Sequence, residues 1–279
     1  MKSTSNDIHR RPVRGKPSRH SVIVLLTDFG TSDHFIGAVK GVIFSINPSA
    51  TIVDISHEVQ PRQIRQAGYL LWAAYKYFPA GTVFLAVVDP GVGTRRRILA
   101  VRTAKYTFLA PDNKLLDFVL SEEKVIESIE VKTQNSPYIL SPISQTFHAR
   151  DIFAPVAAYV ANGVALKEIG KRITLHPAKQ QLVESKNKKT AEVLHIDQFG
   201  NVITNIRMLK NSVPSAKLKS LLMNKKRLSS WVKSYTEASQ QTPSLIAGSS
   251  GLVEIIVKNG SAERLLRAHV GDTMTIRWK

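Results

Sequence analysis

From residue 22 to residue 160, short apolar runs alternate with longer segments in which apolar residues recur at helical spacing. Residues 22–26 are typical of a buried strand, and the apolar positions of 35–46 share one face of a helix that Asn47-Pro48 ends. The alternation predicts an α/β fold, with a mostly parallel sheet between helices. The expected strands are 22–26, 51–55, 83–88, 98–102, 107–110 and 125–129, and the expected helices are 35–46, 64–74, 112–120 and 152–160.

Beyond residue 175 the pattern changes to short strands with Gly-Asn, Asn-Gly and Gly-Asp turns. Expected strands at 191–196, 202–206, 252–257 and 274–278 predict a small antiparallel barrel or sandwich. The predicted domains are a disordered basic leader (1–20), an α/β N-terminal domain (21–175), a linker (176–189) and a β-barrel C-terminal domain (190–279) with a basic insertion (208–243).

The composition is that of a globular protein, with 43% hydrophobic and 22% charged residues among 279. The chain has no cysteine, which excludes disulfides and thiolate metal sites and suits a reducing compartment. No apolar run approaches the ~20 residues that a membrane helix needs. We therefore expect a cytoplasmic protein with no membrane partner.

The net charge of +18 raises the question of a nucleic-acid partner. Much of the excess lies in residues 1–20 and 207–233, and the second of these ranges contains no acid at all. Solvated basic segments explain this distribution better than a nucleic-acid surface does, and no cluster of aromatic residues accompanies the cations.

Four aspartates follow predicted strands of the first domain: Asp28, Asp54, Asp89 and Asp112. Each alone is typical of a turn or helix cap, but together they predict a ligand crevice at the carboxyl edge of the sheet. Such carboxylates either bind Mg²⁺, as in a phosphohydrolase, or accept hydrogen bonds from a ribose. The chain contains neither GxxxxGK[ST] nor GxGxxG, so a phosphate cradle has no support.

Three further segments place polar groups where a site is expected. Asp89 opens the turn Asp89-Pro90-Gly91-Val92-Gly93, and Arg96 follows within reach of its carboxylate. His148 precedes a predicted helix, between a phenylalanine and Ala149-Arg150-Asp151. In the C-terminal domain, Asp197 and Asn201 occupy one Gly turn, which is either an ordinary hairpin or a clamp for an amino-acid head group.

These motifs resemble those of the S-adenosyl-L-methionine hydroxide adenosyltransferases, or S-adenosylmethionine hydrolases, relatives of fluorinase and chlorinase. The matching segments run in family order over nearly the whole chain after residue 21: Leu26-Thr27-Asp28-Phe29-Gly30, Asp54-Ile55-Ser56-His57, Val88-Asp89-Pro90-Gly91-Val92-Gly93-Thr94, Ala110-Pro111-Asp112-Asn113, Phe147-His148-Ala149-Arg150-Asp151 and Asp197-Gln198-Phe199-Gly200-Asn201.

The resemblance implies hydrolysis of S-adenosylmethionine to adenosine and methionine, without metal or cofactor, in a homotrimer whose sites lie between subunits. It makes Asp89, Arg96 and His148 the catalytic residues that hold a water in line with C5′ and the sulfur. The substrate-binding residues that it implies include Asp28 for the ribose, and Asp197 and Asn201 for methionine. They also include Asn113, and Ser249, Glu254 and Val257 at the C-terminal end.

Two differences separate the chain from the halogenating branch of the family. That branch lacks the Asp-Pro-Gly-Val-Gly segment, and it has a tryptophan where this chain reads Pro61-Arg62. A halogenase of the same fold nevertheless remains the first alternative, and a Mg²⁺-dependent phosphohydrolase the second.

Overall fold

The computed structural model describes residues 21–176, 181–184, 189–208 and 218–279. The chain divides into two compact units, residues 1–179 and 180–279. The predicted leader (1–20) and much of the predicted linker (176–189) lie outside the described residues. Within those residues, no helix combines the length and the apolar character needed to cross a membrane.

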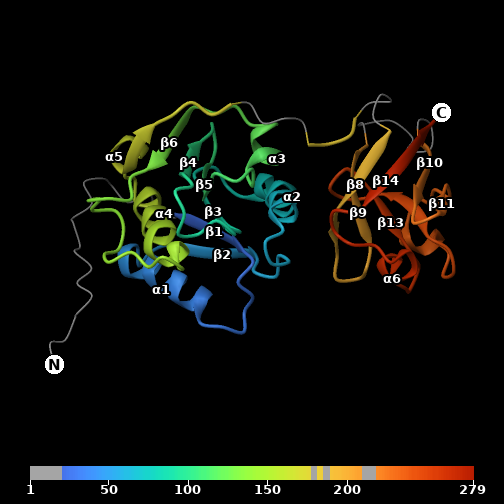
Figure 1. The fold of residues 1–279 in the computed structure, drawn as a ribbon, viewed down its shortest axis with the longest axis horizontal. Coiled ribbons are helices and arrows are strands. Elements are labelled where there is room, and N and C mark those ends of the chain that lie inside the picture. The colour runs from blue at the N-terminus through green and yellow to red at the C-terminus, as the bar shows by residue number, and fades with distance from the viewer. Residues whose placement is uncertain (1–20, 177–180, 185–188, 209–217) are drawn as a thin grey trace. The chain divides into compact units, whose positions relative to one another are not determined.

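The first unit is built on a sheet of seven strands in the order β2-β1-β3-β5-β4-β6-β7 (Figure 1). Pairing is parallel from β2 to β5 and antiparallel from β5 to β7, so that only β4 and β7 run against the rest. The prediction of a mostly parallel sheet is therefore confirmed. The strands are β1 (Val22–Thr27), β2 (Thr51–Ser56), β3 (Val83–Val87), β4 (Ile98–Arg102), β5 (Thr107–Pro111), β6 (Glu127–Val131) and β7 (Gly170–Arg172).

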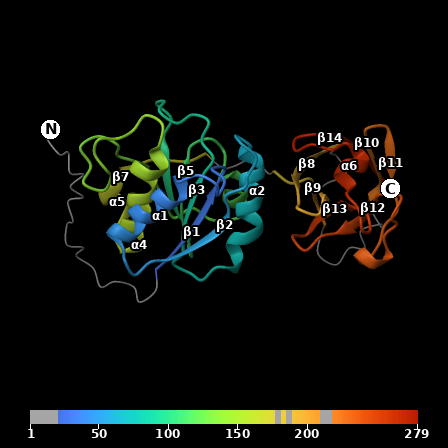
Figure 2. The ribbon, with the colours of Figure 1, turned by 90° about the horizontal axis from the view of Figure 1, so that it is seen from below.

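Helices cover both faces of this sheet. In both ribbon views α1 and α4 lie on one side of the strands and α2 on the other (Figures 1 and 2). The chain passes from β1 through α1 to β2, and then through α2 back to β3 on the other side of β1. The helices are α1 (Phe35–Ile46), α2 (Ile64–Ala74), α3 (Asp117–Leu120), α4 (Ala154–Ala161) and α5 (Leu166–Ile169), with a 3₁₀ turn, η1 (Tyr75–Tyr77), and a π-helical turn, η2 (Ala149–Phe153).

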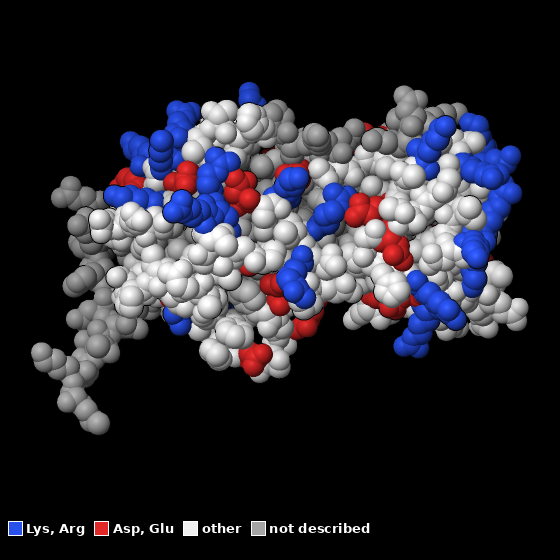
Figure 3. All heavy atoms as spheres, in the orientation of Figure 1, with Lys and Arg blue, Asp and Glu red and all other residues white. Residues whose placement is uncertain are grey.

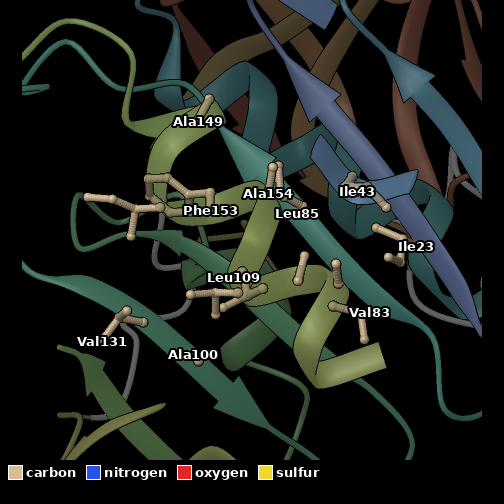
Figure 4. Close-up of a cluster of buried hydrophobic side chains, with 14 of the residues drawn as sticks. Ile23, Ile43, Val83, Leu85, Ala100, Leu109, Val131, Ala149, Phe153 and Ala154 are labelled. Atoms are coloured by element: carbon tan, nitrogen blue, oxygen red, sulfur yellow. The ribbon is translucent and has the colours of Figure 1, made fainter. Parts of the chain in front are cut away.

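The core of the first unit explains why β1 and β3 are almost continuously apolar. Ile23 and Leu85 pack with Ala154 and Phe153 of the α4 layer (Figure 4). The alternate residues, such as Phe84, are just as buried on the opposite face. A strand buried on both faces has no polar positions to alternate with its apolar ones, as in other helix-covered sheets.

The second unit is an antiparallel sheet in the order β11-β10-β14-β8-β9-β13-β12. After β11, Ser230 accepts a hydrogen bond from the Leu245 N–H of β12 at 2.7 Å, and Val232 donates to the Leu245 carbonyl at 3.0 Å. These bonds join the two ends of the sheet into a nearly closed barrel, which confirms the predicted fold. Its elements are β8 (Thr190–Ile196), β9 (Val202–Arg207), β10 (Leu218–Met223), β11 (Lys226–Leu228), η4 (Tyr235–Glu237), β12 (Ser244–Ala247), β13 (Leu252–Ile256), α6 (Ala262–Leu266) and β14 (Thr273–Trp278).

The segment predicted as a basic insertion (208–243) differs from that prediction, because β10 and β11 belong to the sheet. Leu218, Leu221 and Met223 are buried in the barrel core. The cations of these strands take the exposed positions and obscure the strand pattern in the sequence. In the space-filling view they contribute to a gathering of Lys and Arg at the side of the second unit where β10 and β11 lie (Figure 3).

Candidate active site

The strand order of the first unit reverses between β1 and β3, and the candidate residues of this unit follow the strands that end at that point. Thr27 and Val87 are paired at the ends of these two parallel strands. Asp28 and Asp89 therefore leave the sheet at the same edge, in neighbouring positions. In open α/β sheets, ligands bind outside the carboxyl ends of strands at such a reversal.

Asp89 is held by Arg96 across the glycine-rich turn. The Arg96 Nε lies 2.8 Å from Oδ1 and 2.6 Å from Oδ2 of Asp89, and Nη2 also donates to Oδ2. The Gly91 N–H donates to Oδ1 at 3.2 Å, which closes the turn on the aspartate side chain. Both side chains are largely buried, with exposed fractions of 5% and 10%.

His148 completes a three-residue group. Its Nδ1 lies 3.0 Å from Nη2 of Arg96, although the two residues are 52 positions apart in the chain. Burial and the positive charge of Arg96 lower the pKa of His148, and the carboxylates of Asp89 and Asp151 oppose this only in part. A guanidinium can only donate, so Nδ1 accepts, and the neutral imidazole carries its proton on Nε2.

The turn that carries His148 is fixed by buried contacts. His148 directly precedes η2, a π-helical turn of the kind frequently found at functional sites. The neighbouring Phe147 ring contacts Phe29 and Phe35, with centroids 6.0 and 5.2 Å away. These rings connect the start of η2 to the turn that carries Asp28.

The turn after β1 presents the Asp28 carboxylate. Its Oδ2 accepts the Arg62 N–H at 2.9 Å. In the part of the chain that the structure describes, Oδ1 has no hydrogen-bond partner of its own. One carboxylate oxygen is thus anchored, and the other is available to a ligand.

The four strand-end aspartates do not form a common metal site. Asp54 is bonded to Lys40, Asp112 to Arg97, and Asp89 to Arg96, each within 2.8 Å. Among the described residues, no three His, Asp or Glu side chains are grouped so as to hold a metal ion. Carboxylates that each face their own cation are poor candidates for a shared Mg²⁺.

Asn113 connects the end of β5 to the end of β3. Its Nδ2 donates to the Val88 carbonyl at 2.8 Å, and its Oδ1 accepts the Leu115 N–H at 3.2 Å. Both ends of this side chain therefore bond the main chain, next to Asp89. The contact places Asn113 at the edge of the candidate site, as a support for the turn that carries Asp89.

In the second unit, Asp197 and Asn201 form one closed turn between β8 and β9. Oδ1 of Asp197 accepts the N–H groups of Phe199 and Asn201, both at 2.9 Å, and Oδ2 accepts Asn201 Nδ2 at 2.8 Å. Asn201 is buried, while the Phe199 ring is 68% exposed at the tip of the turn.

Glu254 lies on β13 and is buried against the turn between β12 and β13. A Cβ added to Gly248 would lie 1.8 Å from its Oε1, so only glycine lets the carboxylate approach there. Burial and the charge of Asp197 raise the pKa of Glu254, although a hydrogen bond from Tyr235 opposes the shift. Of its predicted neighbours, Ser249 is exposed in the same turn and Val257 is buried beyond the end of β13.

Two aromatic residues of the second unit, Phe199 and Tyr235, lie next to the candidate residues but are not among the predicted site residues. Tyr235 donates its hydroxyl to Glu254 Oε2 at 3.2 Å and leaves half of its side chain exposed. Burial and Glu254 raise the pKa of Tyr235 to about 12. Phe199 has a sequence signal, an aromatic residue within a polar Gly turn, whereas Tyr235 lies in a polar stretch that offers none.

The fold and the site together define a two-domain α/β and β-barrel protein with a carboxylate–guanidinium–imidazole group at the strand-order reversal. Residues 23–170 match the N-terminal domain of the SAM hydroxide adenosyltransferases, and residues 191–275 match the C-terminal domain. The chain belongs to this family, which confirms the resemblance.

Curated relatives agree with this assignment. The chain is 32% identical to an (R)-S-adenosyl-L-methionine hydrolase of Thermus thermophilus over 88% of its length and 94% of the relative's. It is 34% identical to one of Methanocaldococcus jannaschii, with coverage of 91% and 95%. A fluorinase of Actinoplanes is 29% identical, with coverage of 70% and 73%. The crystal structure of an uncharacterized conserved protein from Thermotoga maritima aligns with a TM-score of 0.82 at 37% identity, over 91% of this chain and all of that one.

Proposed function

We propose that the protein hydrolyses S-adenosyl-L-methionine to adenosine and L-methionine, by in-line attack of a water-derived nucleophile on C5′. The observation that carries the proposal is the contact of Asp89, Arg96 and His148 at the reversal point, 2.6–3.0 Å apart where their atoms meet. Relatives that bear the name of this hydrolase over most of their length support it.

The chemistry requires an oriented nucleophile more than an acid. The sulfonium leaves as a neutral thioether, so it needs no proton. Holding the water in line behind C5′ contributes up to ~7–11 kcal/mol in the best-aligned cases. Exclusion of bulk water favours the step further. The negative charge of Asp89 and the positive charge of the sulfonium are both lost as the C–O bond forms and the C–S bond breaks.

We propose a role for each catalytic residue, and the hydrogen-bond pattern supports it. Nδ1 of His148 is occupied by Arg96, so its Nε2–H donates to the oxygen of the bound water. Asp89 is then the basic group next to this water, and it takes the proton as the C–O bond forms and the C–S bond breaks. Arg96 holds both partners in register, and its charge compensates the carboxylate.

The substrate-binding residues follow the polar groups of S-adenosylmethionine. Asp28 accepts the ribose hydroxyls, and Asp197 and Asn201 receive the methionine head group. Ser249, Glu254 and the main chain near Val257 contact the remaining polar edges of the substrate, including the adenine. The exposed ring of Tyr235 next to Glu254 offers a flat surface to that base.

The halogenase alternative meets an electrostatic obstacle in this site. A halide in the position of the water would face the Asp89 carboxylate, and like charges at contact distance repel. The fluorinase relatives support a shared fold and give no reason to expect halide use in this chain.

We further propose a homotrimer in the cytoplasm, with each site formed by the first unit of one subunit and the second unit of a neighbour. The outermost strand β2 supports an assembly, because it leaves its edge unpaired among the described residues and exposes Val53. The proposal includes no metal, cofactor, membrane or nucleic-acid partner.

Incubation of the purified protein with S-adenosylmethionine tests the proposal, with and without chloride, fluoride and EDTA. Adenosine and methionine are the expected products under every condition. A 5′-halogenated nucleoside would establish the halogenase instead, and loss of turnover in EDTA would establish a metal-dependent reaction.

A further inference from the structure

A buried histidine that the mechanism does not use lies beneath the turn of Asp28. His57 follows β2, and its side chain is only 3% exposed. Its Nδ1 lies 2.9 Å from Thr27 Oγ1, and its Nε2 lies 3.1 Å from Asp54 Oδ1. Nδ1 therefore shares a hydrogen bond with Thr27, and Nε2 faces the Asp54 carboxylate, which gives the ring one orientation.

The carboxylate that faces Nε2 is held in place from its other side. Lys40 on α1 donates to Asp54 Oδ2 at 2.6 Å. Although burial raises it, contacts with Lys40 and His57 lower the pKa of Asp54 below its ordinary value. Nδ1 shares a hydrogen bond with the Thr27 hydroxyl on the opposite edge of the ring. A chain of four side chains thus runs from α1 through β2 to the end of β1.

The segment after β2 also holds the turn after β1 through its main chain. The His57 carbonyl accepts the Gly30 N–H at 2.8 Å. The Arg62 N–H donates to Asp28 Oδ2 at 2.9 Å. With the contact between His57 and Thr27, three bonds fix residues 27–30 on both sides of Asp28.

We infer that His57 is a positioning residue for Asp28: through its contact with Thr27, it fixes the turn so that this carboxylate meets the ribose hydroxyls without rearrangement. The inference rests on the proposed function, in which Asp28 binds the ribose. When the turn already has its bound geometry, binding does not lose free energy to ordering it. Loss of the contact with His57 therefore weakens binding and leaves the chemical step unchanged.

Binding of adenosine and of 2′,3′-dideoxyadenosine, which lacks the 2′- and 3′-hydroxyls, tests the inference by calorimetry. Thr27→Val removes the hydroxyl at nearly constant shape, and Thr27→Ser keeps it. We expect Thr27→Val to weaken adenosine binding by about five- to tenfold, the effect of one lost hydrogen bond, and to leave dideoxyadenosine binding unchanged. KM for S-adenosylmethionine should rise in parallel at constant kcat, and Thr27→Ser should restore both values.

Variants at position 57 separate the two ring nitrogens and cover the case in which Thr27→Val fails to fold. Asn places its amide near the position of Nδ1, and Gln near that of Nε2. His57→Gln should therefore raise KM as Thr27→Val does, while His57→Asn stays close to the wild type. Thr51→Val, at the exposed start of β2, is the control and should leave the binding of both nucleosides unchanged.

The outcomes separate this inference from the proposed function. If the wild type prefers adenosine and the Thr27→Val and His57→Gln proteins keep the full preference, the positioning role is wrong and the ribose contact stands. If the wild type binds both nucleosides equally, the ribose contact of Asp28 is wrong, and the positioning role falls with it.

Discussion

At the scale of single residues, the site depends on one guanidinium that bonds two partners of different kinds. Arg96 donates to the carboxylate of Asp89 and to Nδ1 of His148. The first contact balances charge in a largely buried place, and the second fixes the tautomer of the imidazole. The position of the proton on His148 is therefore a consequence of Arg96.

Asp89→Asn should lower kcat by about 10²–10⁴-fold, the usual contribution of a positioned proton acceptor, with a small change in KM. The amide keeps the shape of the side chain and loses the basic oxygen. Adenosine release measured by chromatography gives both constants. Glu127→Gln, which breaks an exposed pair with Arg102, is the control and should keep full turnover; equal turnover in the Asp89→Asn protein would remove the aspartate from the mechanism.

The pH profile reports the state of His148. Burial and Arg96 lower its pKa, so the ring stays neutral down to a pH below the ordinary histidine value of about 6.5. Below its lowered pKa, the protonated ring no longer accepts from Arg96 and faces a like charge. We expect kcat/KM to stay constant through pH 6.5 and to fall only at lower pH. A fall in kcat/KM that begins at or above the ordinary histidine pKa would contradict this assignment.

At the scale of elements, the turn after β3, which carries Asp89, depends on close packing against the segment before η2. Gly93 adopts a φ of +79°, and a Cβ there would lie 2.5 Å from the Gln145 carbonyl. On the other side, Asp151 accepts the Ser144 N–H at 2.7 Å, which holds the same segment. The turns that carry Asp89 and His148 therefore have a common support.

Gly93→Ala should reduce both stability and kcat, whereas Gly163→Ala should reduce stability alone. Both glycines have positive φ, so each variant incurs ~1–2 kcal/mol of backbone strain. Only position 93 adds a clash with a carbonyl, since nothing lies within 4 Å of a Cβ at Gly163. Thermal unfolding and turnover, measured on both proteins, test this difference. An unchanged kcat in the Gly93→Ala protein would show that the packing of Gly93 against Gln145 does not affect catalysis.

The burial pattern of each element decides how well the sequence predicts it. Most strands of the first unit and its helices α1 and α2 have buried apolar faces, so their periodicity predicts them closely. The expected helix 112–120 is wrong over its first half, because only α3 (Asp117–Leu120) is helical. The sequence pattern misses β10, because Lys219 and Ser220 interrupt the apolar residues of a strand in which only Lys219 and Leu222 are exposed. The contact of Arg96 with His148 spans 52 residues, and local pattern contains no information about it; only the family resemblance predicts that pair.

At the scale of the whole molecule, the candidate residues fall into two groups on separate units. Asp28, Asp89, Arg96 and His148 belong to the first unit, and Asp197, Asn201 and Glu254 to the second. In the proposed function, one substrate molecule contacts both groups. In the proposed homotrimer, the second group comes from a neighbouring subunit, so activity depends on assembly.

Mixing two inactive variants tests this arrangement. Asp89→Asn disables the first unit and Asn201→Ala the second. If sites form between subunits, co-refolded mixtures contain some sites with both groups intact and recover part of the wild-type turnover, and the protein elutes at three times the mass of one chain. If each site forms within one chain, every site in the mixture keeps a defect, and activity stays at the level of the separate variants.

The central claim is that an oxygen from water replaces sulfur at C5′, and reaction in water enriched in heavy oxygen tests it most directly. Mass spectrometry of the products should find the label in the 5′-hydroxyl of adenosine, at one atom per molecule, and none in methionine. Unlabelled adenosine, or label in methionine, would contradict the account.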